Sequence, residues 1–147
     1  MPRRSTRPGL TQLGHPTALP AGWGATEWAT RRVVTRAARH GGPRLRWHVA
    51  LSAEVAGRFT EEVDLVFIDG DHSEGGCELD WLLWHDHVRP GGHVVFHDAR
   101  LHGPGGRGLP GPTAVVERLR AAMPAGWSLA AEADRCVALR RRDCTPL

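Results

Sequence analysis

Two short groups of acidic and histidine residues follow apolar runs of the chain and are the residues best suited to chemistry. They are Asp69-Gly70-Asp71-His72 and His97-Asp98. Carboxylates and imidazoles bind divalent cations, so Asp69, His97 and Asp98 are candidate metal ligands. His72 is a candidate general base, because an imidazole titrates near neutral pH. Asp and Gly also serve as turn and cap residues, which for any one position alone is the better explanation.

These groups need two neighbouring strands to bring them together. Residues 63–69, VDLVFID, form a nearly continuous apolar run, which is typical of a parallel strand buried on both faces. The pattern then predicts a helix over about residues 75–88, a break at Arg89-Pro90-Gly91-Gly92, and a second strand over residues 93–97. Ligands of parallel α/β sheets bind beyond the carboxyl ends of the strands. We therefore expect Asp69, His97 and Asp98 to converge if these strands are neighbours.

Upstream of these strands the pattern is weaker. Residues 1–24, rich in Pro, Gly, Thr and Arg, are expected to form an irregular or disordered arm. Helical spacing follows over residues 25–40, and apolar alternation over residues 45–51 predicts a strand. A short helix over residues 52–59 would have Ser52 as its N-cap.

Downstream, a glycine-rich loop over residues 99–112 precedes a helix that Thr113 is expected to cap and that runs to about residue 123. Two closely spaced strands over residues 127–141 predict a hairpin. The fold class is therefore α/β, a Rossmann-like parallel sheet with an antiparallel C-terminal hairpin, and residues 25–147 are expected to form one domain.

Composition narrows the function classes. Of 147 residues, 41% are hydrophobic and 24% charged, as in a soluble globular protein. No apolar run approaches the roughly 18 residues of a membrane span, and no signal peptide is expected. The net charge of +3 comes from arginines spread over separate elements, which is weak support for nucleic-acid binding. Three cysteines without a C-x-x-C motif argue against a disulfide framework or structural zinc site and fit a cytoplasmic protein.

Two motifs at this spacing carry a family resemblance. DLVFIDGDH at Asp64–His72 and RPGGHVVFHD at Arg89–Asp98 resemble the C-terminal half of class I S-adenosylmethionine (SAM)-dependent methyltransferases. In particular they are similar to a small family whose members read DLVFIDGDHSYEG and LRPGGVIAFHD. That family is similar to metal-assisted O-methyltransferases acting on catechols, macrolide sugars and cephalosporin-type antibiotics. The resemblance covers about residues 45–141.

The resemblance implies SAM as cofactor and a small-molecule hydroxyl as methyl acceptor. It implies Asp69, His97 and Asp98 as ligands of Mg²⁺ or another divalent cation, and His72 as the base. A histidine at position 97, where relatives have a carboxylate or amide, makes the case for magnesium weaker. The expected cofactor-binding positions are Ser52, Asp69, Gly70 and Asp71.

The chain also departs from the family pattern. No glycine-rich loop follows a first strand, although the family binds its cofactor there. The family's sheet order is 3-2-1-4-5-7-6; if residues 45–51 are strand 3, strands 1 and 2 are expected to be missing. The strand over residues 63–69 would then expose an unpaired apolar edge. An incomplete methyltransferase fold, completed by a second copy or a partner chain, is the resulting expectation.

Two alternatives stay open. An inactive methyltransferase-like fragment could bind a partner through the exposed sheet edge. A metal-dependent hydrolase is suggested by His85-Asp86-His87, but residues two apart on a helix do not face each other. A solvated helix face is the preferred interpretation of that triplet.

Overall fold

The computed structural model describes residues 10–14, 32–36, 45–102 and 106–143, which belong to two compact units, Met1–Leu51 and Ser52–Leu147. In the first unit, strand β1 (Leu10–Gly14) pairs in parallel with strand β2 (Leu45–Val49). β2 confirms the strand predicted from apolar alternation.

The N-terminal expectations fare unevenly. An irregular arm was predicted over residues 1–24, but β1 lies within it, because a short strand is stabilised by pairing that its own sequence does not reveal. Residues 32–36 are helical and fall inside the helix predicted over residues 25–40. The other residues of the arm and of that helix, and the domain boundary expected at residue 24, lie outside the described residues.

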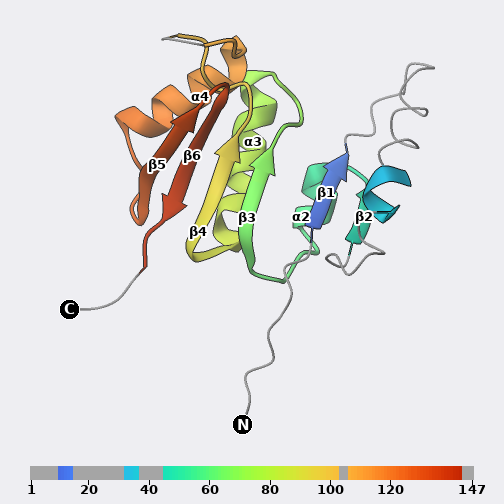
Figure 1. Ribbon diagram of the computed structural model, residues 1–147. Helices are drawn as coiled ribbons and strands as arrows, with labels where there is room; N and C mark the ends of the chain where they lie inside the picture. The colour runs from blue at the N-terminus through green and yellow to red at the C-terminus, as the bar shows by residue number, and fades with distance from the viewer. Residues whose placement is uncertain (1–9, 15–31, 37–44, 103–105, 144–147) are drawn as a thin grey trace. The chain divides into compact units, whose positions relative to one another are not determined.

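The second unit contains a four-stranded sheet in the order β3-β4-β6-β5 (Figure 1). β3 (Val63–Ile68) and β4 (Val88–Phe96) run parallel. β6 (Cys136–Arg141) is antiparallel to both β4 and β5 (Trp127–Ala133). The predicted parallel pair with an antiparallel hairpin is therefore confirmed.

Helices α3 (Glu74–Trp84) and α4 (Pro110–Ala121) cover one face of this sheet, behind it in the view of Figure 1. A short helix, α2 (Ser52–Ala56), and a 3₁₀ turn, η1 (His85–His87), complete the unit. One core joins the helices to the strands; its largest fully buried side chains are Phe96, Leu139, Val88, Val94, Val115, Val116, Val137 and Cys77. Among the described residues, no helix has the length and apolarity needed to cross a membrane.

Several predicted boundaries shift. The helix expected over residues 75–88 ends at Trp84, and β4 begins at Val88, five residues before the predicted start. Arg89-Pro90-Gly91-Gly92 therefore interrupts the pairing of a strand rather than ending a helix. Gly91 has φ +80°, a conformation that glycine adopts without a steric penalty, and the β3–β4 register shifts beside it.

The start of α4 also differs from the prediction. The helix begins at Pro110, where the fixed φ of proline suits a first turn, and not at Thr113. Thr113 does not cap it; its Oγ1 accepts a hydrogen bond from the Leu101 N–H at 3.1 Å. The residue thus ties the preceding loop to the helix.

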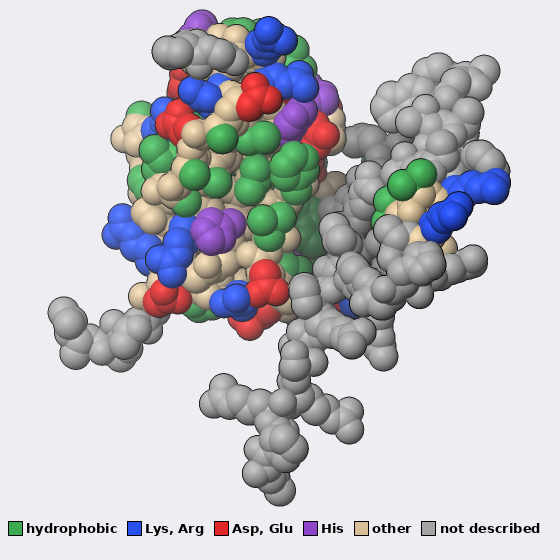
Figure 2. Space-filling view, viewed as in Figure 1, with side chains coloured by type: hydrophobic (Ala, Val, Ile, Leu, Met, Phe, Trp, Pro, Cys, Tyr) green, Lys and Arg blue, Asp and Glu red, His purple; other side chains and the backbone are tan. Residues whose placement is uncertain are grey.

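On the face of the sheet opposite α3 and α4, large apolar side chains of β3 are exposed. Burial on both faces was predicted for β3, yet Leu65 is 54% and Phe67 is 51% exposed. Figure 2 shows this face with a patch of hydrophobic side chains over the strands. The prediction was wrong because an apolar run shows that a strand is hydrophobic, but it does not show whether other elements cover one or both of its faces.

The strand order of the second unit matches part of the order that the resemblance implies, because β3-β4-β6-β5 corresponds to strands 4-5-7-6. Upstream of β3 one strand was expected, at residues 45–51, and the described residues contain two, β1 and β2, which form a separate parallel pair.

Candidate functional site

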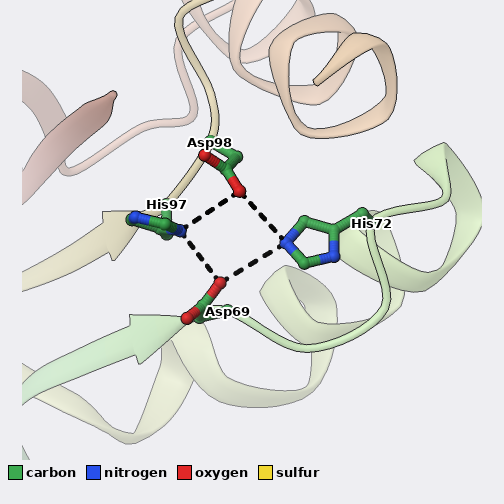
Figure 3. Close-up of side chains that lie close together, drawn as sticks. All are labelled: Asp69, His72, His97 and Asp98. Carbon is green, nitrogen blue, oxygen red and sulfur yellow. Dashed lines mark hydrogen bonds and ion pairs between the residues drawn. The ribbon is translucent and has the colours of Figure 1, made fainter. Parts of the chain in front are cut away.

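Four side chains meet at the carboxyl ends of β3 and β4: Asp69, His72, His97 and Asp98 (Figure 3). One ligand atom from each lies within 4.8 Å of the other three. Asp69 and His97 follow the two strands, Asp98 comes next in the chain, and His72 lies on the turn before α3. The structure thus brings together the three predicted metal ligands and the predicted base.

Oxygen and nitrogen atoms alternate around this cluster. Nδ1 of His97 donates a hydrogen bond to Oδ1 of Asp69 at 3.0 Å and lies 3.3 Å from Oδ2 of Asp98. Nε2 of His72 lies 3.4 Å from the same two carboxylate oxygens. Each imidazole therefore stands between two carboxylates, and all four groups point at one place.

The parallel pairing of β3 with β4 sets Asp69 beside His97. Ile68 is the register partner of Phe96, and the His97 N–H continues the ladder by donating to the Ile68 carbonyl at 3.0 Å. The next residue of each strand therefore leaves the sheet at the same level. This arrangement follows from strand pairing and needs no special loop.

Asp98 occupies a strained and buried position. Its φ of +52° lies in the left-handed region, which is uncommon outside glycine and is often found at functional sites. The residue is 7% exposed. The backbone is held on both sides, since the Leu109 N–H donates to the Asp98 carbonyl at 2.7 Å and the Ala99 N–H donates to the Arg135 carbonyl at 2.9 Å.

Arg135 is a site residue that sequence reasoning missed. Its guanidinium forms an ion pair with Oδ1 of Asp98 at 2.9 Å, which offsets the cost of burying that charge. Within the described part of the chain, this oxygen makes no hydrogen bond. No signal marked Arg135, because it lies in the hairpin turn and only the fold brings it to Asp98.

The turn that carries His72 is held by its neighbours. Asp71 Oδ1 accepts a hydrogen bond from the Ser73 N–H at 2.8 Å, and Ser73 caps α3 by accepting from the Gly76 N–H at 3.1 Å. Gly111 of α4 packs so closely on this turn that a Cβ there would overlap the backbone of residues 72–74. Asp71, predicted to bind cofactor, has a structural role in shaping the loop.

Ser52, also expected to be a cofactor-binding position, lies at the start of a short helix. Helix α2 begins at Ser52, and its Oγ accepts a hydrogen bond from Nε1 of Trp84 at 2.8 Å. The hydroxyl therefore joins α2 to α3. Gly70, the remaining predicted cofactor position, lies on the exposed loop after β3.

The His85-Asp86-His87 triplet lies outside the cluster. The His85 ring stacks on Trp81 with centroids 4.8 Å apart, and His87 makes an edge contact with Phe59 at 5.4 Å. Both imidazoles are half-buried, and only Asp86 is exposed to solvent. The interpretation of the triplet as a solvated helix face therefore holds for Asp86 alone. Packing against aromatic rings accounts for the triplet without a metal, and the hydrolase alternative gains no support.

The four-residue cluster suits a divalent cation. Carboxylate oxygen and imidazole nitrogen are both ligands for such ions. The burial of Asp98, with one oxygen facing both imidazoles, is what a preformed site requires. Asp69 and His72 are more exposed, which leaves the cluster accessible from solvent.

Comparison with solved structures supports the fold. A protein of Corynebacterium glutamicum has 18% identity and a TM-score of 0.63, with 91% of this chain and 61% of that chain covered. The O-methyltransferase TomG from Streptomyces achromogenes, involved in tomaymycin synthesis and solved with SAM, has 16% identity and a TM-score of 0.61, covering 90% and 61%. The MycE methyltransferase of the mycinamycin pathway, solved with Mg, SAH and mycinamycin VI, has 17% identity and a TM-score of 0.57, covering 95% and 46%.

The chain spans less than two thirds of the length of these three proteins, which confirms the predicted incomplete Rossmann-like methyltransferase fold. No curated protein matches. Residues 7–99, more than half of the chain, match the family model described as a methyltransferase domain. The match takes in the strand pair β1–β2 and all four residues of the cluster. The chain therefore belongs to the methyltransferase domain family.

Proposed function

We propose that this chain takes part in methyl transfer from SAM to a hydroxyl group of a small molecule, assisted by a divalent cation. The convergence of Asp69, His72, His97 and Asp98 carries the proposal. It occurs beyond the carboxyl ends of two parallel strands, where ligands of such sheets bind. The SAM complex of TomG and the Mg and SAH complex of MycE support the choice of cofactor and cation class.

In this proposal Asp69, His97 and Asp98 hold the cation. A bound cation would orient the acceptor hydroxyl and lower its pKa. Nε2 of His72, 3.4 Å from both carboxylates, would accept the hydroxyl proton. An O–CH₃ bond forms as the S–CH₃ bond of SAM breaks, leaving S-adenosylhomocysteine. Because this is a direct displacement, placing the oxygen in line with the methyl group is the main requirement.

The loop from Asp69 to Asp71 is the proposed cofactor contact of the second unit. It leaves β3 at the cluster and is exposed. Asp71 and Ser73 fix its path, so its backbone is preorganised before any ligand arrives. Ser52 is retained as a proposed cofactor position, but its hydroxyl already accepts a hydrogen bond from Trp84.

Calorimetric titration with SAM, with and without divalent cation, tests this proposal. We expect saturable SAM binding, and we expect Asp69→Ala to remove cation-dependent binding and methyl transfer while the protein stays folded. Asp86→Ala is the matched control, since Asp86 is 81% exposed at its side chain and lies outside the cluster. Cation dependence that survives Asp69→Ala would reject the site.

A second candidate function is that of an inactive methyltransferase-like domain that binds a second copy or a partner chain. It is favoured by β3, which pairs only with β4 among the described strands of its unit and leaves Leu65 and Phe67 exposed. Light scattering and hydrogen exchange distinguish the two. A dimer with protected β3 amides and no SAM binding would support the interaction domain, whereas a monomer with fast-exchanging β3 amides would reject it.

A further inference from the structure

We propose that the cluster holds its cation through all four side chains, His72 included, and that this ligand set selects a transition-metal dication over Mg²⁺. The inference deepens the proposed function, because it rests on the same cation site. It changes two of its features, the identity of the metal and the resting role of His72.

The distances from the two imidazoles to the carboxylate oxygens are similar, so His72 is as good a candidate ligand as His97. Nε2 of His72 lies 3.4 Å from Oδ1 of Asp69 and 3.4 Å from Oδ2 of Asp98. Nδ1 of His97 lies 3.0 Å and 3.3 Å from those same atoms. Neighbouring ligand atoms around a cation with bonds of about 2.0–2.2 Å lie about 2.8–3.6 Å apart, the lower values in octahedral and the higher in tetrahedral geometry. The four edges of the square in Figure 3 fall in that range.

The ligand chemistry points away from magnesium. Mg²⁺ prefers oxygen ligands, usually one or two carboxylates and several waters. Imidazole suits Zn²⁺, Ni²⁺, Cu²⁺ and Fe²⁺, whose affinity for nitrogen sites is higher. Two imidazoles and two carboxylates within 4.8 Å of one another leave Mg²⁺ few of the oxygen ligands that it prefers.

Asp98 provides an independent reason to expect a ligand here. Its residue is 7% exposed and its backbone is left-handed, yet the Oδ2 atom faces both imidazoles. Burying a carboxylate costs free energy unless both of its oxygens have partners. Arg135 faces the other oxygen, Oδ1, and leaves the Oδ2 side to the cluster.

A consequence for catalysis follows. The atom that would accept the acceptor's proton, Nε2 of His72, is the atom that would bind the cation. With a cation held through this atom, His72 could serve as a base only after its Nε2 is released from the cation.

The test is metal binding to the full chain, without SAM. After removal of metal by a chelator, Zn²⁺, Co²⁺ and Mg²⁺ are titrated separately by calorimetry. We expect one tight Zn²⁺ site, with affinity at least about 100-fold above that for Mg²⁺. His72→Ala should lower Zn²⁺ affinity at least about tenfold and weaken the visible absorption of bound Co²⁺.

The matched control is His93→Ala, which removes a half-buried imidazole from β4 outside the cluster and should leave both signals unchanged. Circular dichroism checks folding, and His72→Asn serves as a second variant. Mg²⁺ binding as tight as Zn²⁺ binding would overturn the metal assignment. Equal Zn²⁺ affinity in the His72→Ala and His93→Ala proteins would overturn His72 as a ligand. Failure to bind SAM would count against the proposed function and leave this result unaffected.

Discussion

The exposure of apolar side chains on β3 can be tested with two leucines that differ in burial. Leu65 lies on β3 and is 54% exposed, whereas Leu139 on β6 is 0% exposed and belongs to the core. Both are leucines within strands of one sheet, so truncation to alanine removes the same atoms from each. The difference in cost then reports the difference in surroundings.

The structure sets the size of each effect. Leu139→Ala removes a fully buried side chain and leaves a cavity, which costs about 2–5 kcal/mol. Leu65→Ala loses less than half of the transfer free energy of a leucine and leaves no closed cavity, so about 1 kcal/mol or less is expected. The two variants should therefore differ by at least about 1 kcal/mol, or by several degrees in Tm for a domain of about 100 residues.

Urea denaturation followed by tryptophan fluorescence measures both costs. The midpoint shift should be large for Leu139→Ala and small for Leu65→Ala, at an unchanged m-value. Equal costs would refute the reasoning, because Leu65 would then be covered in solution by a second copy, a partner or further chain. A concentration-dependent midpoint would identify the second copy.

Two further predictions concern single residues. Burial, with a smaller contribution from the nearby Asp80, raises the pKa of the Cys77 thiol to about 12. In a protein that carries Cys136→Ser and Cys144→Ser, Cys77 should therefore react with a thiol reagent at about pH 8 only after unfolding. Rapid reaction of the folded protein would show that α3 is not packed as described. Gly111→Ala should lower the free energy of unfolding by about 1–3 kcal/mol, because its Cβ would overlap the turn that carries His72. Gly75→Ala should raise the free energy of unfolding by up to about 1 kcal/mol, because Gly75 lies in α3 with open space around it. Urea midpoints measure both, and equal shifts would contradict the close packing of α4 on that turn.

Local patterns predicted much of the second unit. The apolar run before Asp69 indicated β3, and the short spacing between two runs near the C-terminus indicated the β5–β6 hairpin. Boundaries were less certain, since Pro90 and Gly91 stop a helix and also break a strand's pairing. β1 was missed because a strand of five residues owes its stability to pairing with β2.

The sequence by itself determined the residue types of the site and their level in the sheet. The residues around a strand's end indicate where that strand ends. Asp69, His97 and Asp98 could therefore be expected to follow parallel strands at one edge of the sheet. Tertiary structure alone decided what surrounds them. It brought Arg135 from the hairpin to Asp98 and gave Asp98 a left-handed backbone. It also placed His72 beside the carboxylates of Asp69 and Asp98, at distances only slightly longer than those of His97. It also left Leu65 and Phe67 of β3 exposed, because the number of layers covering a strand depends on elements far away in the chain, which hydrophobic periodicity cannot report.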